Sequence, residues 1–252
     1  MPWAFGLRGF PTAGITGQCL TQEGVDMDGP GPTLLLTRPE AQSRSFLADC
    51  ERRLGQRIPT VISPVMDIVP VGEAPDLSEF ATIVVTSGNA VRQLGDNLEG
   101  RRVLTVGEAT AALARGLGAR AEALGETAEA FLERVEEVTF PAIACRGQHA
   151  RCNLADRLSA HGGPTVDAVL YDQVPRPLSR AAHALLAGSS PIVVPVFSPR
   201  SAELLSRIAI AAPMVVLAIS EAARTAWKGG AEFRVAERPT ADSMCDLVVG
   251  AL

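Results

Sequence analysis

The chain repeats itself, because four short segments recur in the same order further along the sequence. The pairs are 36–40 with 144–148, 85–91 with 196–202, 106–112 with 219–225, and 126–129 with 239–242. The spacing between partners is nearly constant, which indicates two copies of one folding unit. Two similar units usually enclose one cleft, and the cleft is where we expect function.

Short apolar runs alternate with helical patterns from residue 33 onward. The run 34–36 suits a strand buried on both faces, and Phe46 and Cys50 give an apolar stripe to a helix over 40–54. Further strands are predicted near 61–63, 82–85, 103–106, 142–145, 166–169, 192–196 and 214–219. Further helices are predicted near 89–98, 108–117, 127–137, 148–160, 178–187, 200–209, 221–228 and 240–250. This alternation predicts an α/β fold with parallel sheets covered by helices on both faces.

Composition excludes several classes of protein. A chain of 252 residues with 47% apolar and 20% charged residues is long enough for two ordinary cores. No run approaches the roughly 18 apolar residues of a membrane span. The net charge of −5 provides no dense basic face for phosphates. We therefore expect a protein that binds neither a membrane nor a nucleic acid. We also expect a monomer.

The cysteines indicate a reducing compartment. Five are present, at 19, 50, 145, 152 and 245, without a Cys-x-x-Cys pair, which is typical of a cytoplasmic protein. Cys145, His149 and Cys152 are close in sequence, but no fourth zinc ligand is apparent. Lys228 is the single lysine, and neither a P-loop nor a Gly-x-Gly-x-x-Gly pattern occurs. We expect no metal and no cofactor.

Two kinds of segment depart from the alternation of predicted strands and helices. Residues 1–32 are rich in Gly and Pro and predict a disordered extension, within which Met27 is a plausible alternative start. The stretches 62–71 and 169–177 are extended and marked by prolines, which suit edge strands or linkers between domains.

Six motifs together resemble the uroporphyrinogen-III synthase family. They are Leu-Leu-Thr-Arg-Pro at 35–39, Val-Thr-Ser-Gly-Asn-Ala-Val at 85–91, Val-Gly-Glu-Ala-Thr-Ala at 106–111, Tyr-Asp-Gln-Val-Pro at 171–175, Phe-Ser-Pro-Arg-Ser-Ala at 197–202 and Ala-Ile-Ser-Glu-Ala-Ala at 218–223. Each motif is weak alone, whereas their order and spacing over 33–252 are specific.

The resemblance implies two similar doubly wound parallel-sheet domains joined by a two-stranded β-ladder. One domain would combine 33–65 with 176–252, the other would span 70–168, and the ladder would use 62–71 and 169–177. Periodicity alone is equally compatible with a plain split near residue 140.

The resemblance also implies a cyclising dehydratase of tetrapyrrole (haem, sirohaem, cobalamin, chlorophyll) biosynthesis. The family closes hydroxymethylbilane, a linear tetrapyrrole with eight carboxylates, to uroporphyrinogen III with inversion of ring D. Such an enzyme works mainly by holding a flexible substrate in one conformation. One alternative is a non-catalytic two-lobed binder of a small anionic ligand. A nucleotide-sugar transferase is a more distant third.

Candidate site residues follow the strands. Strand-to-helix turns offer free backbone N–H groups to anions, and the residues in these turns that we select are Thr86, Ser87, Gly107, Thr110, Ser198 and Ser220. Each hydroxyl could equally be an ordinary N-cap. Arg38, Arg146 and Arg200 follow strand ends, where a guanidinium can bind a carboxylate.

Tyr171 is the single tyrosine and matches the family's functionally implicated tyrosine. Its phenol could donate a proton to the departing hydroxyl, or it could be only an interfacial aromatic. The turn at 220–223 departs from the Gly-Pro-Thr-Thr of some members. The resemblance therefore supports Ser220 as a substrate-binding residue less strongly than it supports Thr110.

Overall fold

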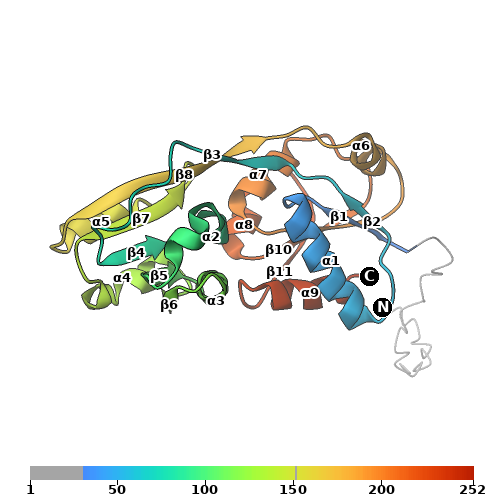
Figure 1. Cartoon of the computed structure of the whole chain (residues 1–252). Helices are drawn as coiled ribbons and strands as arrows, with labels where there is room; N and C mark the ends of the chain where they lie inside the picture. Colours follow the sequence, from blue (N-terminus) through green and yellow to red (C-terminus); the bar gives the residue numbers. More distant parts are fainter. Residues whose placement is uncertain (1–30, 151) are drawn as a thin grey trace, which may run out of the picture. The chain divides into compact units, whose positions relative to one another are not determined.

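The computed structural model describes residues 31–150 and 152–252 (Figure 1). Most of the expected disordered extension, together with Met27 and Cys19, lies outside these residues. Gly31 and Pro32 precede the first strand without regular structure. None of the helices in the described ranges is long and apolar enough to cross a membrane.

The first sheet has five parallel strands in the order β11-β10-β9-β1-β2. Its strands are β1 (Thr33–Leu36), β2 (Thr60–Ile62), β9 (Ile192–Val196), β10 (Met214–Ala218) and β11 (Glu232–Val235). One face packs on α1 (Glu40–Leu54) and α9 (Ala241–Val249). The other packs on α6 (Arg180–Ala187), α7 (Pro199–Ser206) and α8 (Glu221–Ala226).

The second sheet has six strands in the order β3-β8-β7-β4-β5-β6. Its strands are β3 (Met66–Pro70), β4 (Thr82–Val85), β5 (Arg102–Val106), β6 (Arg120–Gly125), β7 (Ala142–Gly147) and β8 (Thr165–Pro175). The helices α2 (Gly88–Leu94) and α3 (Glu108–Gly116) contribute to the core on one face. The helices α4 (Ala128–Leu132) and α5 (Leu154–Ala160) contribute to the core on the other. Both sheets are therefore doubly wound, which confirms the predicted fold class.

An antiparallel pair of strands carries the chain from one sheet to the other (Figure 1). After β2 the chain enters β3, which pairs with β8 from Met66 opposite Pro175 to Pro70 opposite Tyr171. After β8 the chain enters α6 and the first sheet. These two strands are the ladder that the family resemblance implies, and they also continue the second sheet at its edge.

The structure corrects several predicted elements. The sequence pattern missed β6 and β11, because both are edge strands with alternating exposure and therefore lack a continuous apolar run. The strand predicted at 166–169 is the first part of the longer β8. The helix predicted at 148–160 begins only after Asn153, whose side chain caps α5. The helix predicted at 127–137 ends with α4, and a separate 3₁₀ turn follows at Val135–Glu137.

Candidate active site

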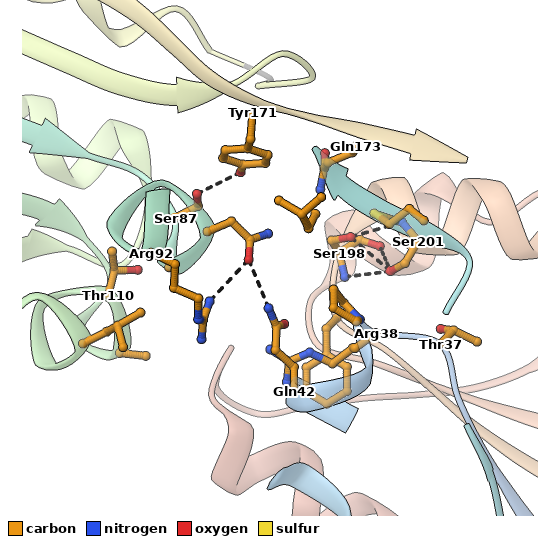
Figure 2. A pocket seen from close by; sticks show the side chains of 18 residues that line it. Thr37, Arg38, Gln42, Ser87, Arg92, Thr110, Tyr171, Gln173, Ser198 and Ser201 are labelled. Atoms are coloured by element: carbon orange, nitrogen blue, oxygen red, sulfur yellow. Dashed lines mark hydrogen bonds between the residues drawn. The ribbon is translucent and has the colours of Figure 1, made fainter. Parts of the chain in front are cut away.

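A cleft of about 580 Å³ is lined by strand ends from both sheets (Figure 2). In the first sheet, Arg38 follows β1 and Ser198 follows β9. In the second sheet, Ser87 follows β4, and Tyr171 projects from β8. The two copies of the repeat therefore contribute corresponding turns to one cavity.

The cavity lies beside the point in each sheet where the order of the strands reverses direction. In the first sheet β9 connects onward to β10, while the neighbouring β1 connects onward to β2 on the other side. In the second sheet β4 and β7 diverge in the same way. Open α/β sheets bind ligands outside the carboxyl ends of strands at such switch points. Topology alone thus selects this cleft as the candidate site.

Tyr171 is buried at the boundary between two cavities. Its side chain is 5% exposed and lines both the main cleft and a smaller cavity of about 250 Å³ that Gly147 and His149 also line. The Tyr171 Oη and Ser87 Oγ atoms lie 2.9 Å apart. Burial raises the pKa of Tyr171, partly offset by hydrogen bonds with Ser87 and Asn89. The phenol is therefore held protonated at neutral pH.

The serine hydroxyls in the turns are engaged as helix caps. Ser87 Oγ accepts a hydrogen bond from Ala90 N at 3.2 Å, and Ser198 Oγ accepts one from Ser201 N at 3.1 Å. The N-cap interpretation therefore holds for both residues. Because a hydroxyl has one proton and two acceptor lone pairs, Ser87 can cap its helix and still contact Tyr171.

The charged side chains of the cleft are positive. Arg38 stacks over Phe197 with its guanidinium carbon 4.1 Å from the ring centroid. Burial, and then the nearby charge of Arg92, lowers the pKa of Arg38 to about 10. Among the described residues, no Asp or Glu lines this cleft. The cavity therefore suits an anionic ligand.

A polar bridge links α1 to α2 across the cleft. Gln42 Nε2 donates to Asn89 Oδ1 at 3.0 Å, along the dashed line that runs up from Gln42 in Figure 2. The same oxygen accepts from Arg92 Nη1 at 3.3 Å. The Asn89 side-chain amide thus holds in place one side chain from α1, which packs on the first sheet, and one from α2, which packs on the second.

Comparison with known proteins places the chain in a family. The model of the family described as Uroporphyrinogen-III synthase HemD matches residues 51–246. The chain belongs to the uroporphyrinogen-III synthase family. This is a family of enzymes, and nothing in the comparisons favours the non-catalytic binder.

Solved uroporphyrinogen-III synthases share the fold. The enzyme of Helicobacter pylori 26695 is 15% identical, with a TM-score of 0.61 over 88% of this chain and 99% of that chain. A mutant enzyme of the extremely thermophilic bacterium Thermus thermophilus is 18% identical, with a TM-score of 0.52 over 88% of this chain and 98% of that chain. No curated protein sequence matches significantly.

The remaining residues predicted from the synthase motifs are placed unevenly. Thr110 lines the main cleft, whereas Thr86 lines the smaller cavity. Gly107 has φ of 83°, which favours glycine, and it is the N-cap residue of α3 without lining either cavity. Ser220 caps α8 and lines neither of these two cavities.

Two of the predicted arginines have carboxylate partners. Arg146 Nε and Nη2 lie 2.7 and 2.6 Å from the two oxygens of Asp167 on the neighbouring strand β8. Arg200 pairs with Glu203 at 3.3 Å and lines a third, separate pocket. Of the three predicted arginines, Arg38 is the one that the structure brings into the main cleft.

Sequence reasoning missed several residues of this synthase cleft. They are Thr37, Gln42, Asn89, Arg92, Gln173 and Phe197. Arg92 could have been found, because it lies one helical turn after Gly88 on a predicted helix. Phe197 is part of a motif, but its role as a platform for Arg38 requires the adjacency of β1 and β9.

The described cysteines are predicted to differ in reactivity. Burial raises the pKa of the Cys145 thiol to about 12, and Cys50 and Cys245 are also buried. Cys152 is partly exposed. Because the thiolate is the reactive form, we expect iodoacetamide at neutral pH to label Cys152 faster than Cys145 by about tenfold or more. Peptide mass spectrometry measures both rates, and equal labelling rates would contradict the predicted difference in reactivity between the two thiols.

Cys145, His149 and Cys152 are close in sequence but form no metal-ligand group in the described structure. Within 31–150 and 152–252, no group of three His, Cys, Asp or Glu side chains is arranged to hold a metal ion. His149 instead lies 3.2 Å from Asp172.

Proposed function

We propose that the protein closes hydroxymethylbilane to uroporphyrinogen III in the cleft between the two sheets. The observation that carries the proposal is a cavity at both switch points that combines a buried phenol with arginines and, among the described residues, no lining carboxylate. A substrate with eight carboxylates needs such positive surroundings. The family supplies the reaction type, and the geometry supports its location.

In the proposed mechanism Tyr171 assists departure of the hydroxyl. The phenol donates its proton as the C–O bond of the hydroxymethyl group breaks. Water departs, and the terminal pyrrole becomes an azafulvene. The substituted carbon of ring D attacks it to give a spiro intermediate, which fragments and recloses with ring D inverted. The proton lost when the last pyrrole regains aromaticity balances the one that Tyr171 gave. The net change is loss of one water molecule.

The larger contribution is expected to come from orientation. Without the enzyme, closure gives the uninverted isomer, so the protein must hold a flexible chain with ring D against the azafulvene carbon. The bridge between Gln42 and Asn89, with Arg38 on one side and Ser87 on the other, gives the cavity fixed polar walls.

The organisation around this site follows the same proposal. We assign one domain to 33–65 with 176–252 and the other to 70–168, with 62–71 and 169–177 between them. Further expectations are a monomer, a cytoplasmic location, and binding to neither nucleic acid nor a membrane. The described cysteines form no disulfide, which is compatible with a reducing compartment.

The proposed function predicts how product composition depends on the amount of protein. We expect the fraction of isomer III to rise with protein concentration when fresh hydroxymethylbilane is added and the oxidised uroporphyrins are separated. Heat-denatured protein serves as the control and should give isomer I. A non-catalytic binder would leave isomer I as the product at every concentration.

A further inference from the structure

The amino end of α1 lacks the serine cap that α2 and α7 have at the cleft. The helices α2 and α7 begin with the serine caps Ser87 and Ser198, whereas α1 begins after Pro39, which provides no side-chain cap. The first amide of α1 that has a backbone acceptor outside the helix is Ser43 N, which donates to Pro39 O at 3.0 Å. The earlier amides at 40–42 have no such acceptor among the described residues. They carry the positive end of a helix of 15 residues.

A buried hydroxyl without a partner lies beside this helix end. Thr37 is 1% exposed and lines the cleft, and its Oγ1 has no hydrogen-bond partner among residues 31–150 and 152–252. Thr37 directly follows β1 and precedes Arg38, and Figure 2 shows both among the side chains that line the cleft. Burying a hydroxyl without a hydrogen bond costs free energy. A ligand in the cleft can supply the missing acceptor.

Two guanidinium groups face the same space without carboxylate partners. Arg38 and Arg92 both line the cleft, and neither is within 4.0 Å of an Asp or Glu oxygen in the described part of the chain. The charge of Arg92 acts on Arg38 strongly enough to lower the pKa of Arg38 further than burial alone. Anions placed with these groups would relieve that repulsion.

We propose that Thr37, Arg38 and Arg92 form a subsite for the two carboxylates of one pyrrole ring. Eight carboxylates over four rings give two acidic arms to each ring. Arg38, the Thr37 hydroxyl and the free amides of α1 donate to one arm, and Arg92 binds the other from α2. The assignment rests on the proposed function, because that function provides a ligand with paired acidic arms. It adds Thr37 and Arg92 to the substrate-binding residues.

Kinetics of Thr37→Val and Arg92→Ala with hydroxymethylbilane test the subsite. We expect each change to raise KM by about tenfold or more, since each removes a hydrogen bond to a charged group, with a much smaller effect on kcat. Thr37→Val should keep or raise Tm, because the hydroxyl that it deletes has no protein partner in the described structure. A purely structural role for Thr37 would lower Tm and leave KM unaltered, which would overturn the subsite.

Arg180→Ala is the matched control for loss of a positive charge. Arg180 is exposed at the start of α6 and does not line the main cleft. Its KM should stay at the wild-type value. If Arg92→Ala and Thr37→Val also keep that KM while the wild-type protein still makes isomer III, the subsite is wrong and the proposed function stands.

Fluorescence titration with two oxidised porphyrins separates the subsite from turnover. Uroporphyrin III has two carboxylates on each ring, whereas coproporphyrin III has one. We expect Arg92→Ala to weaken binding of uroporphyrin III about tenfold and to change binding of coproporphyrin III much less. An equal loss for both porphyrins, or none for either, overturns the paired-carboxylate subsite even if the protein makes no isomer III.

Discussion

Replacing Tyr171 with Phe is expected to lower kcat by about a hundredfold, the lower end for loss of a general acid. The phenol is buried and hydrogen-bonded to Ser87, so the change removes one hydroxyl and leaves the ring in place. Spontaneous closure then competes with the slowed enzyme. The product should therefore contain more isomer I, which separation of the oxidised uroporphyrins measures.

The pH dependence of Tyr171→Phe provides a second readout. Because burial raises the pKa of Tyr171, the wild-type phenol stays protonated up to a higher pH than an ordinary tyrosine. We expect loss of wild-type kcat through this group only above pH of about 10, the usual tyrosine value. That alkaline limb should be absent from the Phe variant.

Ser87→Ala is the control for Tyr171→Phe. It removes the hydrogen bond to Tyr171 and the cap of α2 but keeps the phenol. We expect a loss of about 1 kcal/mol of stability from the cap and a smaller fall in kcat than for Tyr171→Phe. Wild-type turnover together with a wild-type ratio of isomers in Tyr171→Phe would show that the acid role is wrong.

Gly147→Ala is expected to displace the Tyr171 side chain by placing a Cβ atom against its ring. A Cβ atom at Gly147 would lie 2.5 Å from Tyr171 Cζ and 2.8 Å from its Oη, so the ring would have to move. Such overpacking costs about 1–3 kcal/mol of stability. We expect kcat, measured on the folded fraction, to fall by about tenfold or more, because even a small displacement of a catalytic group slows the reaction strongly.

Gly163→Ala provides a matched overpacking variant away from the cleft. Its Cβ would lie 2.0 Å from Phe140 Cγ, and neither residue lines the main cleft. Thermal unfolding should show that both glycine variants are destabilised. Only Gly147→Ala should show a lower kcat per folded molecule. A wild-type kcat for Gly147→Ala would contradict the catalytic role of Tyr171.

Elements with strong local signals could be predicted from the sequence. The run 34–36 became the buried strand β1, and the helix predicted over 40–54 is α1, because burial on both faces or along one stripe leaves a clear apolar pattern. Edge strands such as β6 bury little and leave a weak pattern. The pairing of β3 with β8 joins segments about a hundred positions apart, so only the family resemblance could indicate it.

Some of the residues that line the main cleft could be selected from the sequence motifs. Arg38, Ser87, Thr110, Tyr171 and Ser198 were selected from the sequence, and all of them line the main cleft. Their roles in binding and catalysis stay predictions.

Other features of the site depend on three-dimensional neighbours. Arg146 looked equivalent to Arg38, yet Asp167 on the adjacent strand occupies its guanidinium. Thr37 was missed, because its importance lies in having no hydrogen-bond partner among the described residues, which no sequence pattern reveals.

A single-turnover experiment with the protein in excess tests the central claim most directly. Hydroxymethylbilane is mixed with a molar excess of protein, the reaction is stopped before spontaneous closure is significant, and the oxidised uroporphyrin isomers are separated. The account predicts that nearly all of the product is isomer III. Isomer I, formed at the rate seen without protein, would contradict it.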